Sequence, residues 1–283
     1  MIRRLLLRTA GLVWLLTACH ATDPTPAVTP TVATLPPAGT AAALLLPAEA
    51  ALGDTLTRPG DGMTLRYVPG QHGPASGPGN FWLDETEVSN AQFATFLNSA
   101  GSNPAGAQNW LNLAEDGALL ALQGTRYLPR PGYEDHPLVQ VSWYGAAAYC
   151  AWAGGQLPTT AQWQWAARGA NEGPFPWGDT VDGSQLNFCD ANCPILPGRE
   201  ADLDDGFART APVGSYPAGA SWAGALDMAG NVWEWVADGS DPGREMLGGS
   251  WASPLRQSTI TSLETRPPEQ QYPFVGFRCL LLP

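Results

Sequence analysis

The stretch from Gly224 to Trp235 places two carboxylates on either side of a tight turn. Asp227 and Glu234 flank Gly230 and Asn231, a residue pair that is typical of turns. Such a turn aims backbone carbonyls to one side, and carboxylate and carbonyl oxygens are the ligands that Ca²⁺ prefers. The spacing is not that of an EF-hand loop, so a solvated turn beside a buried tryptophan pair explains the pattern equally well.

This stretch is one of a series of short motifs that occur in a fixed order over roughly residues 63–281. The series reads TEVSN at 86–90, HP at 136–137, VSW at 141–143, AYCAWAG at 148–154, LPT at 157–159, APVG at 211–214, DMAGNVWEW at 227–235, GGSW at 248–251 and GFRC at 276–279. These motifs closely resemble the formylglycine-generating enzyme, or sulfatase-modifying factor, family. The resemblance implies an irregular, loop-rich α+β fold of the C-type-lectin-like kind, with short helices and short antiparallel strands.

The patterning elsewhere predicts short elements joined by long loops. Gly 32 and Pro 27 together make up about a fifth of the chain, a content that argues for a loop-rich domain. Alternation of apolar residues and short apolar runs predict strands at 63–70, 81–83, 246–247, 251 and 277–280. Residues 102–135 fit either a small hairpin or a helix, and residues 170–223 are expected to be almost all loop.

Capping residues predict three helices. Ser89 stands three residues before Gln92, and Thr159 stands three residues before Gln162, which is the spacing of a capping box at a helix N-terminus. Ser142 precedes an alanine-rich run and is expected to cap a helix between the other two. These helices would support the loops that carry the carboxylates.

The amino-acid composition limits both the size of the hydrophobic core and the classes of molecule that the protein could bind. The chain has 283 residues with 44% hydrophobic content, enough for one sizeable core or for one domain with appendages. The net charge is -12, and all 14 basic residues are arginine. An acidic surface repels nucleic acid and anionic lipid and attracts divalent cations, so we do not expect a nucleic-acid partner.

The first 18 residues have the pattern of a secretory signal. Basic residues precede an apolar run that is too short to span a membrane as a stable anchor. The run ends in Leu16-Thr17-Ala18-Cys19, which resembles the cleavage site of bacterial lipoproteins and makes Cys19 the expected lipidated N-terminus. An ordinary signal followed by a chance cysteine is the alternative. His20 does not resemble the aspartate of an inner-membrane retention signal, so we expect export to the outer membrane of the bacterial cell envelope.

The pattern divides the chain into three parts. Residues 1–18 form the signal peptide, residues 19–52 a tether rich in Pro, Thr and Ala, and residues 53–283 the folded domain. The tether has almost no charge or aromatic content, so it cannot bury enough apolar surface to offset its ordering entropy. The membrane would therefore be reached through the lipid on Cys19.

Four cysteines remain once Cys19 takes the lipid. An exported chain favours pairing them, and four cysteines allow three connectivities. The family resemblance implies the pair Cys150–Cys279, which leaves Cys189 to pair with Cys193 across a short loop. The alternative for these last two is a metal-binding or redox-active thiol pair.

The resemblance further implies two structural calcium sites. The first set is Asn187 and Asp205 through side chains, with Phe188 and Phe207 through carbonyls. The second set is Asp227 and Glu234 through side chains, with Gly230 and Val232 through carbonyls. The alternative interpretation of the first set is an acidic loop that is exposed to solvent and binds no ion.

The family's oxidase reaction implies a copper(I) ion held by two cysteine thiolates. The corresponding positions, three and eight residues after Ser250, are Ser253 and Ser258. Hydroxyl oxygen is a poor substitute for sulfur as a ligand of soft Cu(I), so copper is not expected and no catalytic residue is assigned. A hydrolytic triad of these serines with His136 has no support in their spacing.

Three functions compete on this reading. The first is a lipid-anchored envelope protein whose calcium-stabilised domain binds an unidentified protein or glycan ligand. Its contact face would be the loop region at 250–270, with candidates Ser250, Trp251, Arg256, Arg266 and Tyr272. The second is a formylglycine-generating oxidase, or a related oxidative maturation factor, with an atypical site. The third is a structural component of a surface complex. In the first and third cases the chain is a binding or scaffold module and not an enzyme.

Overall fold

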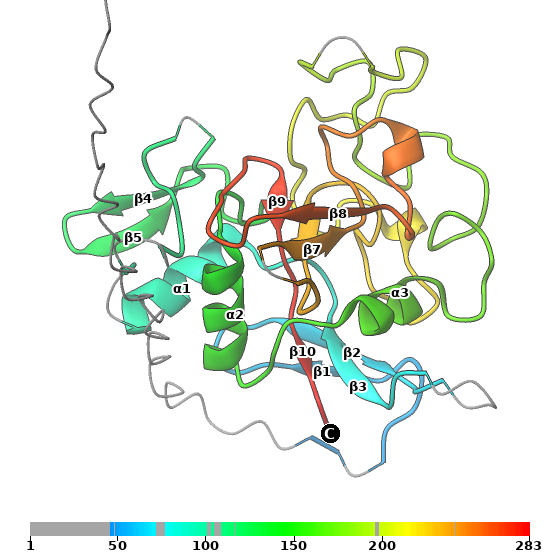
Figure 1. Cartoon of the computed structure of the whole chain (residues 1–283), viewed down its shortest axis with the longest axis horizontal. Helices are drawn as coiled ribbons and strands as arrows, with labels where there is room; N and C mark the ends of the chain where they lie inside the picture. The colour runs from blue at the N-terminus through cyan, green and yellow to red at the C-terminus, as the bar shows by residue number, and fades with distance from the viewer. Residues whose placement is uncertain are drawn as a thin grey trace, which may run out of the picture. The chain divides into compact units, whose positions relative to one another are not determined.

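The final strand of the chain pairs with the third strand, so the C-terminal residues form an edge strand of the first sheet of the fold (Figure 1). This computed structural model describes residues 46–47, 49–71, 77–100, 103–104, 109–115, 117–195, 198–240 and 242–283. The predicted signal peptide, Cys19 and most of the tether lie outside the described residues. Leu46 and Ala50, which precede the predicted domain start at residue 53, pack against the main core.

The first sheet is antiparallel throughout and carries the N-terminal half of the core. Its strands, in spatial order, are β1 (Thr55–Thr57), β2 (Thr64–Val68), β3 (Phe81–Asp84) and β10 (Leu280–Leu281). Every residue of β3 is buried, and Leu280 of β10 faces Leu83 in register. The two strands predicted at 63–70 and 81–83 are therefore confirmed.

A second four-stranded sheet positions the Asp227–Trp235 motif. Its order is β8 (Leu263–Arg266), β7 (Arg244–Leu247), β6 (Trp233–Trp235) and β9 (Val275–Gly276). β6 and β9 are parallel, whereas the other two pairs are antiparallel, so the expectation of antiparallel strands holds with one exception. Glu234 lies in the middle of β6, between Leu247 of β7 and Gly276 of β9.

The three helices begin where the capping residues placed them. They are α1 (Asn90–Ala100), α2 (Trp143–Trp152) and α3 (Thr160–Arg168). Thr159 and Gln162 complete a capping box at α3, and the Ser142 hydroxyl accepts a hydrogen bond from the Gly145 amide at α2. The Ser89 hydroxyl likewise accepts from the Gln92 amide at 3.3 Å. These interactions are local, which is why the sequence specifies them.

Residues 102–135 contain a hairpin, which was one of the two predicted alternatives. Strands β4 (Leu120–Gln123) and β5 (Arg126–Pro129) pair antiparallel, and β5 packs against α1 (Figure 1). The long loops also contain two 3-10 helices, η1 (Pro217–Gly219) and η2 (Leu255–Gln257). The strand predicted at Trp251 is wrong, because this residue lies in a turn. Of the strand predicted at 277–280, only Leu280 lies in a strand, because residues 277–279 connect β9 to β10.

A disulfide joins the second helix to the end of the chain. Cys150 of α2 is bonded to Cys279, the pairing that the family resemblance implied. Around it, Phe93, Tyr149 and Phe277 pack in one aromatic cluster, with Phe93 and Tyr149 stacked at 5.6 Å between ring centroids. Among the described residues, no helix is long and apolar enough to cross a bilayer.

Candidate functional site

The loop after β7, residues 248–258, holds both Ser253 and Ser258, and we call it the serine loop. Gly248 and Gly249 have positive φ angles of 95° and 79°. A Cβ on Gly249 would lie 2.5 Å from the Cα of Ser258, so this position requires glycine and brings residue 258 against the start of the loop. Ser253 folds back on the same loop, where its hydroxyl lies 3.1 Å from that of Ser250.

Both serines are buried and their hydroxyl groups are engaged by the loop itself. The Ser253 oxygen also accepts a hydrogen bond from the Ser250 amide at 3.2 Å, and the Ser258 hydroxyl donates to the Pro254 carbonyl at 3.5 Å. Because the two hydroxyls satisfy the loop backbone, they act as structural groups here. The arrangement offers hard oxygen atoms where Cu(I) chemistry needs sulfur.

The second disulfide lies directly beside this loop, which the sequence did not indicate. Cys189 and Cys193 are bonded to each other, and both are buried. The Cys189 amide donates to the Ser253 carbonyl at 2.9 Å, and the Cys193 sulfur lies 3.9 Å from the Trp251 carbonyl oxygen. The sulfur atoms near the serine loop are therefore held as a disulfide and are not free thiols.

Asn231 connects the serine loop to the two neighbouring segments. Its side-chain oxygen accepts hydrogen bonds from the Ala211 amide at 2.9 Å and from the Asn187 side-chain amide at 3.0 Å. Its backbone amide donates to the Asn187 carbonyl at 2.7 Å, and its carbonyl accepts from the Trp251 amide at 2.9 Å. Its φ of 53° is one of the few positive values outside glycine in the described chain. The Gly-Asn turn thus assembles three loops far apart in sequence.

The second predicted calcium set is rearranged by an arginine. Glu234 accepts two bonds from Arg278, from Nε and Nη2 at 2.7 Å each, and one from the Trp163 indole at 2.8 Å. Arg278 is fully buried and its remaining donors reach the carbonyls of residues 84, 85 and 226. The negative charge of Glu234 is therefore balanced by Arg278. Asp227, the other acid of the second predicted calcium set, has no arginine partner in the described part of the chain.

Glu87 lies beside Asp227, and the sequence did not indicate that Glu87 belongs to this site. It is completely buried, and among the described residues neither of its carboxylate oxygens has a hydrogen-bond donor. Burial and then the Asp227 carboxylate raise the pKa of Glu87 well above its usual range. Burial also raises the pKa of Asp227, although the Gly214 amide donates to it at 2.6 Å. Glu87 belongs to the TEVSN motif, and this membership was the only signal in the sequence.

The first predicted set contains a buried oxygen without a partner. Asn187 donates from its amide nitrogen to the Arg209 carbonyl at 2.8 Å, but its side-chain oxygen is buried and accepts nothing. The Asp205 carboxylate accepts from the amides of Phe188 and Phe207 at 2.8 and 2.9 Å. Burial raises the pKa of Asp205 to about 6 despite these two donors. This set also lies beside the second one, because a Cβ on Gly230 would be 2.1 Å from the Asn187 carbonyl oxygen.

The buried charges do not balance within the described part of the chain. Six acidic residues are buried against two arginines, and the arginines pair with two of these acids, Arg58 with Asp84 and Arg278 with Glu234. Arg58 also pairs with Asp61, a residue of intermediate exposure. The four remaining acids form two neighbouring pairs, Glu87 with Asp227 and Asp190 with Asp205. Each pair carries two negative charges when ionised, which one divalent cation or protons would neutralise. No group of three or more His, Cys, Asp or Glu side chains that could hold a metal occurs among the described residues.

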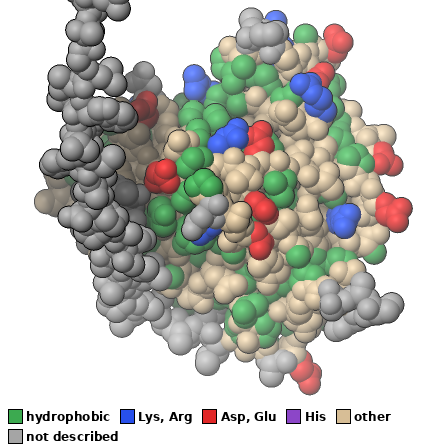
Figure 2. Space-filling view, viewed as in Figure 1, with side chains coloured by type: hydrophobic (Ala, Val, Ile, Leu, Met, Phe, Trp, Pro, Cys, Tyr) green, Lys and Arg blue, Asp and Glu red, His purple; other side chains and the backbone are tan. Residues whose placement is uncertain are grey.

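The predicted contact face is dispersed in the structure. Arg256 lies exposed on η2, whereas Arg266 on β8 forms an ion pair with Glu264. The Tyr272 ring stacks on Phe274 and its hydroxyl donates to the side chain of a neighbouring glutamine. On the face drawn in Figure 2, charged side chains are scattered singly or in small groups among apolar and polar ones. Of the five candidates, only Trp251 lines the pocket described next.

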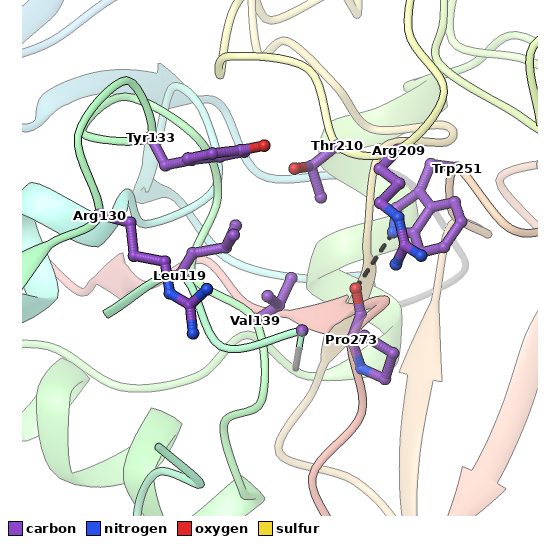
Figure 3. Close-up of a pocket in the computed structure, with 9 residues that line it drawn as sticks. Leu119, Arg130, Tyr133, Val139, Arg209, Thr210, Trp251 and Pro273 are labelled. Atoms are coloured by element: carbon purple, nitrogen blue, oxygen red, sulfur yellow. Dashed lines mark hydrogen bonds between the residues drawn. The ribbon is translucent and has the colours of Figure 1, made fainter. Parts of the chain in front are cut away.

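A cavity of about 300 Å³ opens beside Trp251, and we call it the arginine pocket (Figure 3). Arg130 and Arg209 stand on its opposite sides, with Val139 between them. The Arg209 guanidinium lies over the Trp251 ring, 5.2 Å from its centroid. Sequence analysis missed both arginines: Arg209 precedes the APVG motif by two residues, but nothing distinguishes Arg130.

Further polar groups line the rim of the same pocket. The Tyr133 ring and Thr210 face it from two loops, and the Thr210 hydroxyl lies 3.0 Å from Nδ1 of His136. Burial lowers the pKa of His136 below its ordinary value. This histidine has no contact with the serine loop among its hydrogen bonds, so the structure gives no support to a hydrolytic triad.

The fold and the serine loop define a class of irregular α+β domains built on buried polar networks. Residues 73–282 match the family model of the sulfatase-modifying factor enzyme 1-like domain, and the chain belongs to this family. It is 31% identical to the formylglycine-generating enzyme of Streptomyces coelicolor, over 70% of this chain and 77% of that enzyme.

Other curated relatives match over a smaller share of their length. The inactive C-alpha-formylglycine-generating enzyme 2 of Mus musculus is 36% identical over 50% of this chain and 48% of that protein. The serine/threonine-protein kinase Pkn1 of Chlamydia trachomatis is 39% identical over 56% of this chain, which spans only 23% of that kinase. The chain is thus similar to segments of proteins that carry different names.

Solved structures confirm the fold class. The structure of PvdO from Pseudomonas aeruginosa superposes with a TM-score of 0.62 at 20% identity, covering 82% of this chain and 99% of that one. Treponema denticola variable protein 1 superposes with a TM-score of 0.55 at 18% identity, covering 81% and 99%. At these identities the similarity concerns the fold alone.

Proposed function

We propose that this chain is a binding or scaffold module of the cell envelope that retains the family fold without its copper oxidase site. The observation that carries the proposal is the serine loop, in which Ser253 and Ser258 are buried and hydrogen-bonded to their own loop. The resemblance to a relative named inactive supports the idea that this fold persists without oxidase chemistry. A fold of this kind supplies long loops, and long loops are where binding sites occur.

Titration of the purified protein with Cu(I), under anaerobic conditions that preserve both disulfides, tests the absence of the oxidase site. We expect no tight binding, because all four cysteines of the described chain are held in disulfides and none is a free thiol. The double variant Ser253→Cys/Ser258→Cys should gain one Cu(I) per chain, since the loop already brings both positions together. Its matched control, Ser253→Ala/Ser258→Ala, should gain none.

Tight one-to-one binding by the unaltered protein would contradict the proposal. It would favour the alternative function, a formylglycine-generating oxidase or related maturation factor with an atypical site. If binding appeared only after reduction and was lost in Cys189→Ser/Cys193→Ser, these two cysteines would be its ligands. Their position beside Ser253 is the specific observation behind this alternative.

We further propose that two structural calcium ions neutralise the surplus buried acids. One would lie at Asn187 and Asp205, where an orphaned amide oxygen and a carboxylate are available, and the other at Asp227 with Glu87. Glu87 would add free carboxylate oxygens to the predicted second set of Asp227, Gly230, Val232 and Glu234, in which Glu234 also pairs with Arg278. Hard oxygen donors of this kind suit Ca²⁺.

Thermal unfolding with calcium and after chelation tests these ions. We expect calcium to stabilise the protein by about 2.7 kcal/mol per site at 100 times the dissociation constant. Glu87→Gln should lose part of this gain, yet unfold at a higher temperature than the unaltered protein without calcium, because it removes a buried like charge. Glu172→Gln, a change at an exposed acid, is the control. Equal melting temperatures with and without calcium would contradict the proposal.

Attachment to the envelope is proposed from Cys19 and the pattern that precedes it. A lipid on this residue would anchor the domain through the tether, with the outer membrane as the expected location. Mass spectrometry of the mature N-terminus checks this directly. An unmodified N-terminus at any other residue would remove the anchor from the proposal.

A further inference from the structure

The arginine pocket presents two cationic side chains to a hollow with apolar walls. None of the described residues that line it is acidic. Neither guanidinium makes an ion pair or hydrogen bond with another described residue, whereas Arg58, Arg66, Arg266 and Arg278 all pair with carboxylates. In a chain of net charge -12, two arginines that face one cavity without a protein carboxylate are available to a negatively charged ligand.

The pocket is preorganised on the Arg209 side. The Trp251 ring is fixed by a hydrogen bond from its indole nitrogen to the Pro273 carbonyl at 3.1 Å, drawn as the dashed line in Figure 3. Arg209 lies over this ring, so its guanidinium is held by a cation–π contact. Opposite, the Arg130 amide donates to the Leu119 carbonyl at 2.8 Å, which fixes the base of that side chain. A ligand would therefore meet groups that are already in place.

The walls of the pocket indicate the size and chemical character of the ligand that would carry the negative charge. Val139, Leu119 and Pro273 supply apolar surface, and the Tyr133 ring is 40% exposed at the rim. A volume of about 300 Å³ is at the small end of ligand pockets, which suits one ring. Guanidinium groups bind carboxylate and sulfate oxygens through paired hydrogen bonds.

We propose that the arginine pocket binds a single-ring acidic sugar, a uronate or a sulfated sugar, and that the two guanidinium groups supply the positive charge that attracts it. The inference names the ligand class of the binding module proposed above and rests on that function. The sugar ring would pack on Tyr133 and Pro273, and its hydroxyl groups would reach Thr210. The same chemistry is offered by a free monosaccharide and by the terminal unit of an acidic polysaccharide.

Calorimetric titration of the intact protein with glucuronate, with glucose as its neutral counterpart, tests the inference. We expect glucuronate to bind and glucose not to bind, with affinity falling as salt rises. Arg209→Gln and Arg130→Gln should each weaken glucuronate at least about tenfold, because a hydrogen bond to a charged group is lost. Arg168→Gln changes an exposed arginine outside the pocket and should leave the affinity unchanged. An oligoglucuronate that binds more tightly than the monosaccharide would identify a polysaccharide end as the source.

Three outcomes would overturn the inference. Glucose could bind as well as glucuronate, no acidic sugar could bind at all, or an aspartate-rich peptide could bind more tightly than any sugar. The melting temperatures of the variants are measured in parallel, so loss of folding is not mistaken for loss of binding. The copper titration involves neither Arg130 nor Arg209. A protein that binds neither copper nor acidic sugars would lose this inference and keep the proposed non-oxidase function.

Discussion

Replacing Arg278 with methionine should lower the free energy of unfolding by about 3–5 kcal/mol, measured by urea unfolding at a fixed calcium concentration. The arginine is fully buried and forms two hydrogen bonds with Glu234. Without it, Glu234 joins Glu87 and Asp227 as buried acids that have no arginine partner among the residues the structure describes. Three backbone carbonyls also lose their donors.

The same substitution at Arg256 provides the control. This arginine is exposed on η2, and its replacement should change the stability by no more than about 0.5 kcal/mol. If Arg278→Met does not fold, Arg278→Lys retains the charge with fewer donors and should be destabilised less. In the double variant Arg278→Met/Glu234→Gln, part of the stability should return, because one unpaired charge is removed. A loss below about 1 kcal/mol for Arg278→Met would contradict the role assigned to this ion pair.

Removing the two disulfides should have unequal effects. The Cys150–Cys279 bond closes a loop with a sequence separation of 129, and loop entropy gives about 5 kcal/mol as an upper figure. The Cys189–Cys193 bond has a separation of 4, for which the same relation gives about 2 kcal/mol. The pair of variants Cys150→Ala/Cys279→Ala and Cys189→Ala/Cys193→Ala compares them directly, by urea unfolding with calcium fixed.

The two double variants control for each other. All four cysteines are buried, so the loss of sulfur contacts is similar in both, and the difference isolates the loop length. We expect the long-range pair to lose about 3 kcal/mol more than the short-range pair. Equal losses would show that local packing, and not restriction of the unfolded chain, determines what these bonds contribute.

Local interactions are what the sequence determined by itself. The capping residues Ser89, Ser142 and Thr159 specified where the helices begin, because their hydrogen bonds reach only three residues along the chain. The motif series indicated the family, which the family model confirms. The identity of Ser253 and Ser258 is likewise a property of the sequence, and it limits the chemistry of that loop whatever the fold.

Only the tertiary structure decided which charged groups meet. Glu234 forms two hydrogen bonds with Arg278, 44 residues further along, a pairing that the sequence did not indicate. Glu87 joins Asp227 across 140 positions for the same reason: a folded core brings together groups that no periodicity relates. The arginine pocket arises in this way as well, since Arg130 and Arg209 lie on segments far apart in sequence. These segments meet through tertiary hydrogen bonds, such as that between Thr210 and His136. Side-chain hydrogen bonds between distant segments settle such choices, and a linear motif does not encode them.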